Sequence, residues 1–384
     1  MNKKELSEIK KQYTKERCPA TRICGCYVDG EKNKQTMFRE AFLSLEEEAF
    51  FKYLNIFRKV MSGTIGKNLV TMEFPLETEQ EGGTQEFLMK LKYSGLQDDG
   101  VLEEFYDKVI ASYDYTGNYL ILLLHAAYDV PGKSSDNLEM FDASDEVYEH
   151  VLCAICPVNL SKPCLSYNQL ENCFENHIQD WLVEMPQTGF LFPAFHDRSS
   201  DIHAVLCYHQ KPEAPALSLV NEVLGCTLPM TAGGQKESFE LLVEETLGEE
   251  CSFEAVRTLH ETLNEMIEEQ KEEPDPLMLG SGEVRRLLEQ TGASNEKIEA
   301  FDQHFEEVVG EQNTEFVAAN VAHTRKFEIK TPEVVIQVNP DRADLVETRE
   351  IDGRRYLMIE VTDEVEVNGI QVKFSENVAN ISET

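Results

Sequence analysis

Two pairs of His and Asp residues lie within eight positions of one another, at His196, Asp197, Asp201 and His203. Imidazole and carboxylate groups together suit a divalent metal, which activates water for hydrolysis. The same stretch separates two apolar runs, and Asp and Ser are common in turns because their side chains hydrogen-bond nearby backbone. We favour the turn and keep a metal-dependent hydrolase or nuclease as the alternative. The sequence indicates no other catalytic residue, because it contains no G-x-S-x-G motif and no Cys with a catalytic signature.

A second group with metal-like spacing is His150, Cys153 and Cys156. A zinc site needs its sulfurs on one side, whereas residues three apart in a strand point to opposite faces. The surrounding run is strand-like, so we expect buried thiols and no bound metal. Cys24 and Cys26, two positions apart, are expected to share one strand face. No motif indicates a cofactor.

The first residues form a basic segment with a helical pattern. Its acids, Glu5, Glu8 and Glu16, interleave with the bases, which favours a solvated helix face over a nucleic-acid surface. If nucleic acid binds directly, the candidate residues are Lys3, Lys4, Lys10, Lys11, Lys15 and Arg17.

The charge of the whole chain opposes such binding. It has 35 Lys and Arg against 71 Asp and Glu, a net charge of −36, and residues 237–315 are especially acidic. An acidic surface repels nucleic acid and anionic membranes, so a protein partner is favoured over direct nucleic-acid contact. No apolar run reaches the roughly 20 residues of a membrane helix, and no secretory signal is present. We therefore expect a cytoplasmic protein that does not bind membranes.

The elements that would position these residues follow from the hydrophobic pattern. Runs at 119–130 and 148–158, with a hairpin at 189–208, predict an antiparallel sheet. Helical periodicity is found at 50–61, 237–247, 252–271, 281–291 and 295–309. We predict an α+β fold with a central, mostly antiparallel sheet covered by the helices of 237–271, an acidic helical middle region and a small C-terminal β unit.

The same pattern predicts the domain organisation. Residues 1–112 form a mainly helical region that is basic at its start, and 113–320 hold the central sheet and the acidic helices. Residues 321–375 form the C-terminal β unit, in which Asp352-Gly353 is a preferred hairpin turn. Residues 376–384 are expected to be a disordered tail.

Several segments carry a resemblance to a known family: RICGCYVDGEKN, SGTIGKNLVTMEFP, EGGTQEFL, VLCAICPVNLSK and VEMPQTGFLFPAFHDRSSDIH. They resemble the bacterial domain-of-unknown-function family 4317, a likeness that implies no activity. A fainter likeness concerns residues 189–242 and the segment VVIQVNPDRADLVETREIDGRRYLMIEV. These are similar in order to the nucleoid-associated NdpA-like family, which implies a chromosome-associated, non-enzymatic cytoplasmic protein.

The favoured function is therefore that of a non-catalytic nucleoid-associated or protein-interaction protein. The metal-dependent hydrolase or nuclease is the alternative. Convergence of His196, Asp197, Asp201 and His203 in a cleft would favour the enzyme, whereas their separation on an exposed turn would favour the interaction protein.

Overall fold

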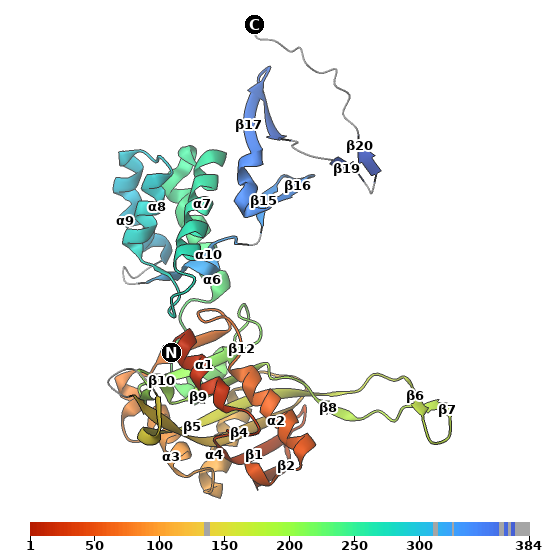
Figure 1. Cartoon of the computed structure of the whole chain (residues 1–384). Helices are drawn as coiled ribbons and strands as arrows, with labels where there is room; N and C mark the ends of the chain where they lie inside the picture. Colours follow the sequence, from red (N-terminus) through yellow and green to blue (C-terminus); the bar gives the residue numbers. More distant parts are fainter. Residues whose placement is uncertain (134–138, 310–313, 325, 361–364, 368–369, 373–384) are drawn as a thin grey trace. The chain divides into compact units, whose positions relative to one another are not determined.

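The computed structural model describes residues 1–133, 139–309, 314–324, 326–360, 365–367 and 370–372. The chain divides into two compact units (Figure 1). The first comprises Met1–Glu237 and Glu272–Pro276, and the second comprises Ser238–Lys271 and Leu277–Thr384. The predicted disordered tail, 376–384, lies outside the described residues.

Eight strands of the first unit form one antiparallel sheet, in the order β2-β1-β4-β5-β9-β12-β3, with β8 also paired to β5. These strands are β1 (Ala20–Val28), β2 (Lys34–Ala41), β3 (Leu69–Glu73), β4 (Asn118–Lys133), β5 (Glu139–Leu160), β8 (Trp181–Val183), β9 (Thr188–Phe192) and β12 (Ala204–His209). The predicted central antiparallel sheet is confirmed. The first 112 residues, expected to be mainly helical, contribute three of its strands.

Strand β4 shows why the sequence of this sheet is so continuously apolar. Tyr119, Ile121 and Leu123 belong to the core on one face, and the alternating residues Leu120, Leu122 and Leu124 belong to the core on the other face. Successive side chains of a strand point to opposite faces, so a strand that is buried on both sides needs apolar residues at every position.

Helices cover both faces of the sheet. One face packs against α3 (Thr84–Tyr93), α4 (Asp99–Ser112) and the π-helical turn η3 (Val220–Leu224). The opposite face packs against α1 (Lys3–Gln12) and α2 (Glu47–Val60). The prediction that the helices of 237–271 cover the sheet is wrong, because the two cores around it contain no residue of that segment among the described residues. The short helical turns of this unit are η1 (Phe42–Ser44), η2 (Leu76–Glu79) and α5 (Leu217–Leu219).

The predicted hairpin at 189–208 is present, with a smaller hairpin at its tip. β9 pairs with β12, and between them β10 (Ala194–His196) pairs with β11 (Ser199–Asp201). Asp197 and Arg198 have φ values of 47° and 62°. Positive φ at both central residues is the geometry of a type I′ turn, which matches the twist of paired strands.

A long arm, residues 161–184, leaves the end of β5 and returns through β8. Its tip is the two-stranded ribbon β6 (Leu165–Asn168) and β7 (Cys173–Asn176). In Figure 1 the ribbon extends away from the sheet and its covering helices.

The second unit holds the acidic helices and the C-terminal hairpins. Its helices, one of which begins in the first unit, are α6 (Ala232–Leu247), η4 (Gly248–Glu250), α7 (Phe253–Glu269), α8 (Ser281–Gln290), α9 (Asn295–Val309), α10 (Ala318–Val321) and η5 (Pro340–Leu345). Its strands are β13 (Met278–Leu279), β14 (Phe316–Val317), β15 (Phe327–Lys330), β16 (Val335–Val338), β17 (Val346–Ile351), β18 (Arg354–Ile359), β19 (Val365–Val367) and β20 (Ile370–Val372). The acidic helical region and the small β unit are confirmed, and Asp352-Gly353 forms the turn between β17 and β18. Within the described part of the chain, no helix has the length and apolar character needed to span a membrane.

Candidate functional site

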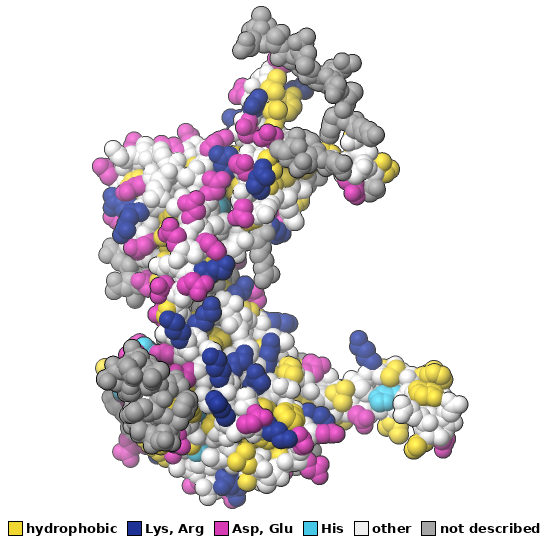
Figure 2. Space-filling view, viewed as in Figure 1, with side chains coloured by type: hydrophobic (Ala, Val, Ile, Leu, Met, Phe, Trp, Pro, Cys, Tyr) yellow, Lys and Arg dark blue, Asp and Glu magenta, His cyan; other side chains and the backbone are white. Residues whose placement is uncertain are grey.

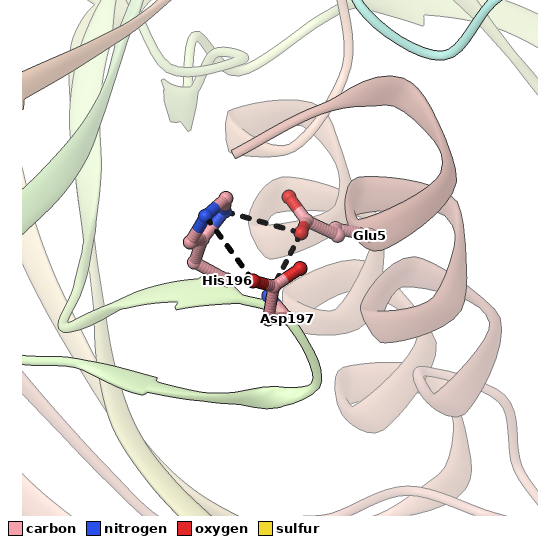
Figure 3. Close-up of side chains that lie close together, drawn as sticks. All are labelled: Glu5, His196 and Asp197. Atoms are coloured by element: carbon pink, nitrogen blue, oxygen red, sulfur yellow. Dashed lines mark hydrogen bonds and ion pairs between the residues drawn. The ribbon is translucent and has the colours of Figure 1, made fainter.

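The tip of the small hairpin places His196 and Asp197 beside Glu5, in the first turn of α1 (Figure 3). His196 Nδ1 lies 3.3 Å from Glu5 Oε1, and His196 Nε2 lies 3.7 Å from Asp197 Oδ2. One donor atom from each residue lies within 4.8 Å of the other two. These are ligand types that a divalent cation accepts.

Existing hydrogen bonds already use the Glu5 carboxylate. Its Oε2 accepts the backbone N–H of Asn2 at 2.7 Å, and its Oε1 accepts that of Asp197 at 3.0 Å. Asn2 and Glu5 form a capping box, which satisfies backbone donors at the start of α1. The arrangement therefore acts as a structural latch between α1 and the hairpin, and a cation would have to compete with it.

Asp201 and His203 belong to a different set of contacts. His203 Nδ1 lies 2.5 Å from Glu79 Oε1, and this hydrogen bond raises the pKa of His203. Asp201 Oδ1 accepts the backbone N–H of His203 at 3.1 Å, a local turn contact. The structure thus brings two of the four predicted residues together and places the other two around Glu79 and the local backbone.

The His150, Cys153 and Cys156 group is divided by the sheet. Cys153 faces the core formed with α3 and α4, whereas Cys156 faces the core formed with α2. Burial raises the pKa of both thiols, for Cys156 to about 12, so they are protonated at neutral pH. As predicted, Cys24 and Cys26 share one face. These residues behave as parts of the core.

Four of the predicted basic residues share one face of α1. Lys3 and Lys10 are seven positions apart, as are Lys4 and Lys11, and seven residues make nearly two helical turns. The four side chains therefore lie within about 120° of the helix circumference, away from the buried residues Glu5, Leu6 and Ile9. The remaining two follow the helix: Lys15 pairs with Glu47, and Arg17 is exposed.

Helix α2 extends this face with two bases that the sequence analysis did not select, Arg58 and Lys59. Burial lowers the pKa of Lys10, and the charges of Arg58 and Lys59 lower it further. Lys10 Nζ donates to Ser62 Oγ at 2.5 Å, which holds it at the end of α2. Figure 2 shows Lys and Arg side chains gathered over α1 and α2. We call this set the basic surface: Lys3, Lys4, Lys10, Lys11, Arg58 and Lys59.

The arm exposes an unusual number of large apolar side chains, none of which the sequence analysis selected. They are Leu165, Tyr167, Leu170, Phe174, Ile178, Trp181, Leu182 and Val183. Leu170 is 96% exposed and Ile178 is 82% exposed. Exposed large apolar side chains concentrated on one segment are typical of interaction surfaces. The sequence does contain a pattern that could have identified the arm. Its apolar residues are interspersed with Asn, Gln and Glu at spacings that fit neither an amphipathic helix nor a buried strand.

Comparison with known proteins places this architecture in a family. The model of a family described as a domain of unknown function (DUF4317) matches residues 1–370. The chain belongs to this family. The match includes the residues of the sheet, the arm and the acidic helices, and it confirms the resemblance predicted from the sequence. A search of the curated proteins finds no match. The likeness to the nucleoid-associated NdpA-like family stays a prediction.

Proposed function

We propose that this protein is a non-catalytic interaction protein that associates with a second copy of itself through the arm. The observation that carries this proposal is the exposed apolar surface of residues 161–184. An isolated two-stranded ribbon is marginally stable in water, and apolar side chains on it gain free energy when another surface covers them.

The ribbon has internal contacts that shape it for such a role. The rings of Tyr167 and Phe174 lie 5.3 Å apart across the two strands, and Tyr167 Oη donates to Asn172 Oδ1 at 2.6 Å. These contacts fix the pairing of β6 and β7 but leave both rings exposed. The apolar surface is therefore already formed before a partner binds, and binding would cost little conformational entropy in the ribbon.

A second copy of the chain is favoured as the partner because one chain carries both the arm and a surface of opposite charge. The arm carries Glu171, Glu175, Asp180 and Glu184 against Lys162, so it is acidic. The basic surface on α1 and α2 offers the opposite charge on the same chain. In a two-fold dimer the arm of each copy would contact the basic surface of the other copy. The binding surface and the arm belong to the same chain, so they are always present in equal amounts.

The test is the mass of the full chain in solution, measured by size-exclusion chromatography with light scattering over a wide concentration range. We expect about twice the chain mass of 43.8 kDa. The double variant Leu170→Asp, Ile178→Asp is expected to be monomeric, because it would place two carboxylates in the covered surface. Leu76→Asp is the matched control, since Leu76 is also highly exposed but lies outside the arm. A monomeric parent chain, or a double variant that still dimerises, contradicts the proposal.

Nucleoid association is a second candidate function, supported by the basic surface. Duplex DNA binding, measured by fluorescence anisotropy, should weaken steeply with salt as counterions are released. The variant Lys10→Gln, Lys11→Gln, Arg58→Gln, Lys59→Gln should lose this binding, whereas Lys162→Gln should not. Salt-insensitive binding, or binding that survives the fourfold change, would exclude this surface as the DNA site.

The alternative of a metal-dependent hydrolase or nuclease receives less support. It requires His196, Asp197, Asp201 and His203 to act together, and the contacts described above divide them into two groups. The structure places Glu5, which was not among these four residues, beside His196 and Asp197, and its carboxylate already accepts two backbone N–H groups.

A further inference from the structure

The loop Glu272–Pro276 belongs to the first unit, although the residues before and after it belong to the second. The backbone oxygen of Pro274 accepts the N–H of Lys3, the first residue of α1, at 3.1 Å. The next two N–H groups of this helix donate to the side chain of Asn2. The first N–H groups of a helix have no partner inside it, so the loop supplies part of the cap of α1. The loop is thereby held at the start of the helix that carries most of the basic surface.

This loop is strongly acidic. Its sequence, EEPDP, carries three carboxylates and no base, and all three acidic side chains are exposed. Lys3 and Lys4, two members of the basic surface, are exposed at the same end of α1. Because consecutive Cα atoms are about 3.8 Å apart, the backbones of Glu273 and Asp275 lie within about 10 Å of the backbone of Lys3. That distance is roughly one Debye length at physiological ionic strength, so these charges interact.

We propose that the loop is an intramolecular competitor, which lowers the affinity of the basic surface for an acidic segment such as the arm of a second copy. Its three carboxylates reduce the positive potential at Lys3 and Lys4, and a partner must displace or outweigh them to reach these lysines. This role of the loop rests on the function proposed above, because it takes the basic surface as the surface that binds the arm. It adds regulation to that function, since the chain limits its own association.

Variants that remove the charges and keep the backbone test this role. The loop variant leaves Pro274 and its carbonyl in place and carries Glu272→Gln, Glu273→Gln and Asp275→Asn. The control removes three exposed carboxylates from α9 and changes the net charge equally, with Glu296→Gln, Glu299→Gln and Glu306→Gln. Sedimentation equilibrium of the full chain should show dimerisation about tenfold tighter in the loop variant than in the control. Equal affinities of the two variants would contradict the role of the loop and leave self-association standing.

A probe that does not depend on self-association separates the two proposals. Fluorescein-labelled decaglutamate is purely anionic, and its fluorescence anisotropy reports binding to the full chain. At low salt we expect binding to the loop variant about tenfold tighter than to the control, and a smaller difference at high salt because the charges are screened. Adding Lys3→Gln and Lys4→Gln to the loop variant should remove this gain. A gain that persists in the combined variant, or no gain at all, overturns the proposal whether or not the parent chain dimerises.

Discussion

His150 and Tyr13 form a buried polar contact that attaches the end of α1 to the sheet. His150 Nε2 accepts the Tyr13 hydroxyl at 2.6 Å, and Nδ1 donates to the backbone oxygen of Tyr148 at 3.2 Å. Because a carbonyl oxygen can only accept, Nδ1 carries a proton, and in the neutral ring Nε2 is then the acceptor of the Tyr13 hydroxyl. Burial lowers the pKa of His150 from 6.5 to about 3. The residue that resembled a zinc ligand is thus a neutral packing and hydrogen-bonding group.

This lowered pKa predicts a pH dependence of stability. The unfolded chain takes up the His150 proton as the pH falls below 6.5, whereas the folded chain does so only near 3. The free energy of unfolding of the first unit should therefore fall with pH across this window, by at most about 1.4 kcal/mol per pH unit from this residue. Urea unfolding of the parent and of His150→Gln between pH 7.5 and 5 would measure the difference in slope.

His203 provides a control, because its pKa is raised rather than lowered and its contribution to stability should change with pH in the opposite direction. Glu79 raises its pKa, so its contribution is full at low pH and is lost as the pH rises through the raised value. Replacing His203 with Gln should remove stability at the acidic end. Equal slopes for the parent chain and His150→Gln would show that His150 is not held neutral.

The Glu5 latch gives a second prediction at the same scale. Replacing Glu5 with Ala should cost about 1 kcal/mol, because it removes a helix cap and leaves two backbone N–H groups without that acceptor. Replacing His196 with Ala should change stability by less than about 0.5 kcal/mol, because its side chain is mostly exposed. Thermal melts with and without added zinc would measure both. A zinc-dependent rise in Tm that both variants abolish would instead establish a metal site.

At the scale of elements, α7 shows how far local sequence determines structure. The Ser252 side chain accepts the backbone N–H of Ala255, and the buried stripe is Ala255, Leu259 and Leu263. The sequence predicts a helix over 252–271, and the helix spans Phe253–Glu269. An apolar stripe shows that a helix has a buried face, but it does not identify the surface that covers it. For that reason the helix was predicted correctly and assigned to the wrong neighbour, the sheet.

The two sides of α7 predict opposite mutational responses. Leu263 is fully buried, so Leu263→Asp would bury an unpaired carboxylate and cost several kcal/mol in the second unit. Glu268 makes an exposed pair with Lys271, so Glu268→Lys should change stability by no more than about 0.5 kcal/mol. Chemical denaturation of both variants tests this. Small and equal effects would mean that the buried stripe does not stabilise the helix.

At the scale of the whole molecule, each compact unit has a core of its own. We therefore predict two thermal transitions in differential scanning calorimetry. Leu122→Ala, which leaves a cavity in the core of the sheet, should lower only one of them, and Leu263→Asp should lower only the other. A single transition that both variants lower together would show that the units unfold as one.

The sequence predicted the centre of the sheet better than its edges. Strands β4, β5, β9 and β12 are long or strongly apolar, so the hydrophobic pattern identifies them. The short connection between β9 and β12 predicts a hairpin, and a hairpin pairs its strands antiparallel. Strand β2 is largely exposed and polar, so it carries little hydrophobic pattern. Glu5 was missed as a neighbour of Asp197 because 192 residues separate them, and no local rule brings such residues together.

Trp181, on β8 at the base of the arm, is the single tryptophan of the chain and is 57% exposed. The indole emission of the unmodified protein therefore arises entirely from this one position. If a second copy covers the arm, the indole loses water contact, and its emission maximum should move to shorter wavelength as the concentration rises. The fold thus contains its own optical probe of arm burial, which responds without a label or a mutation.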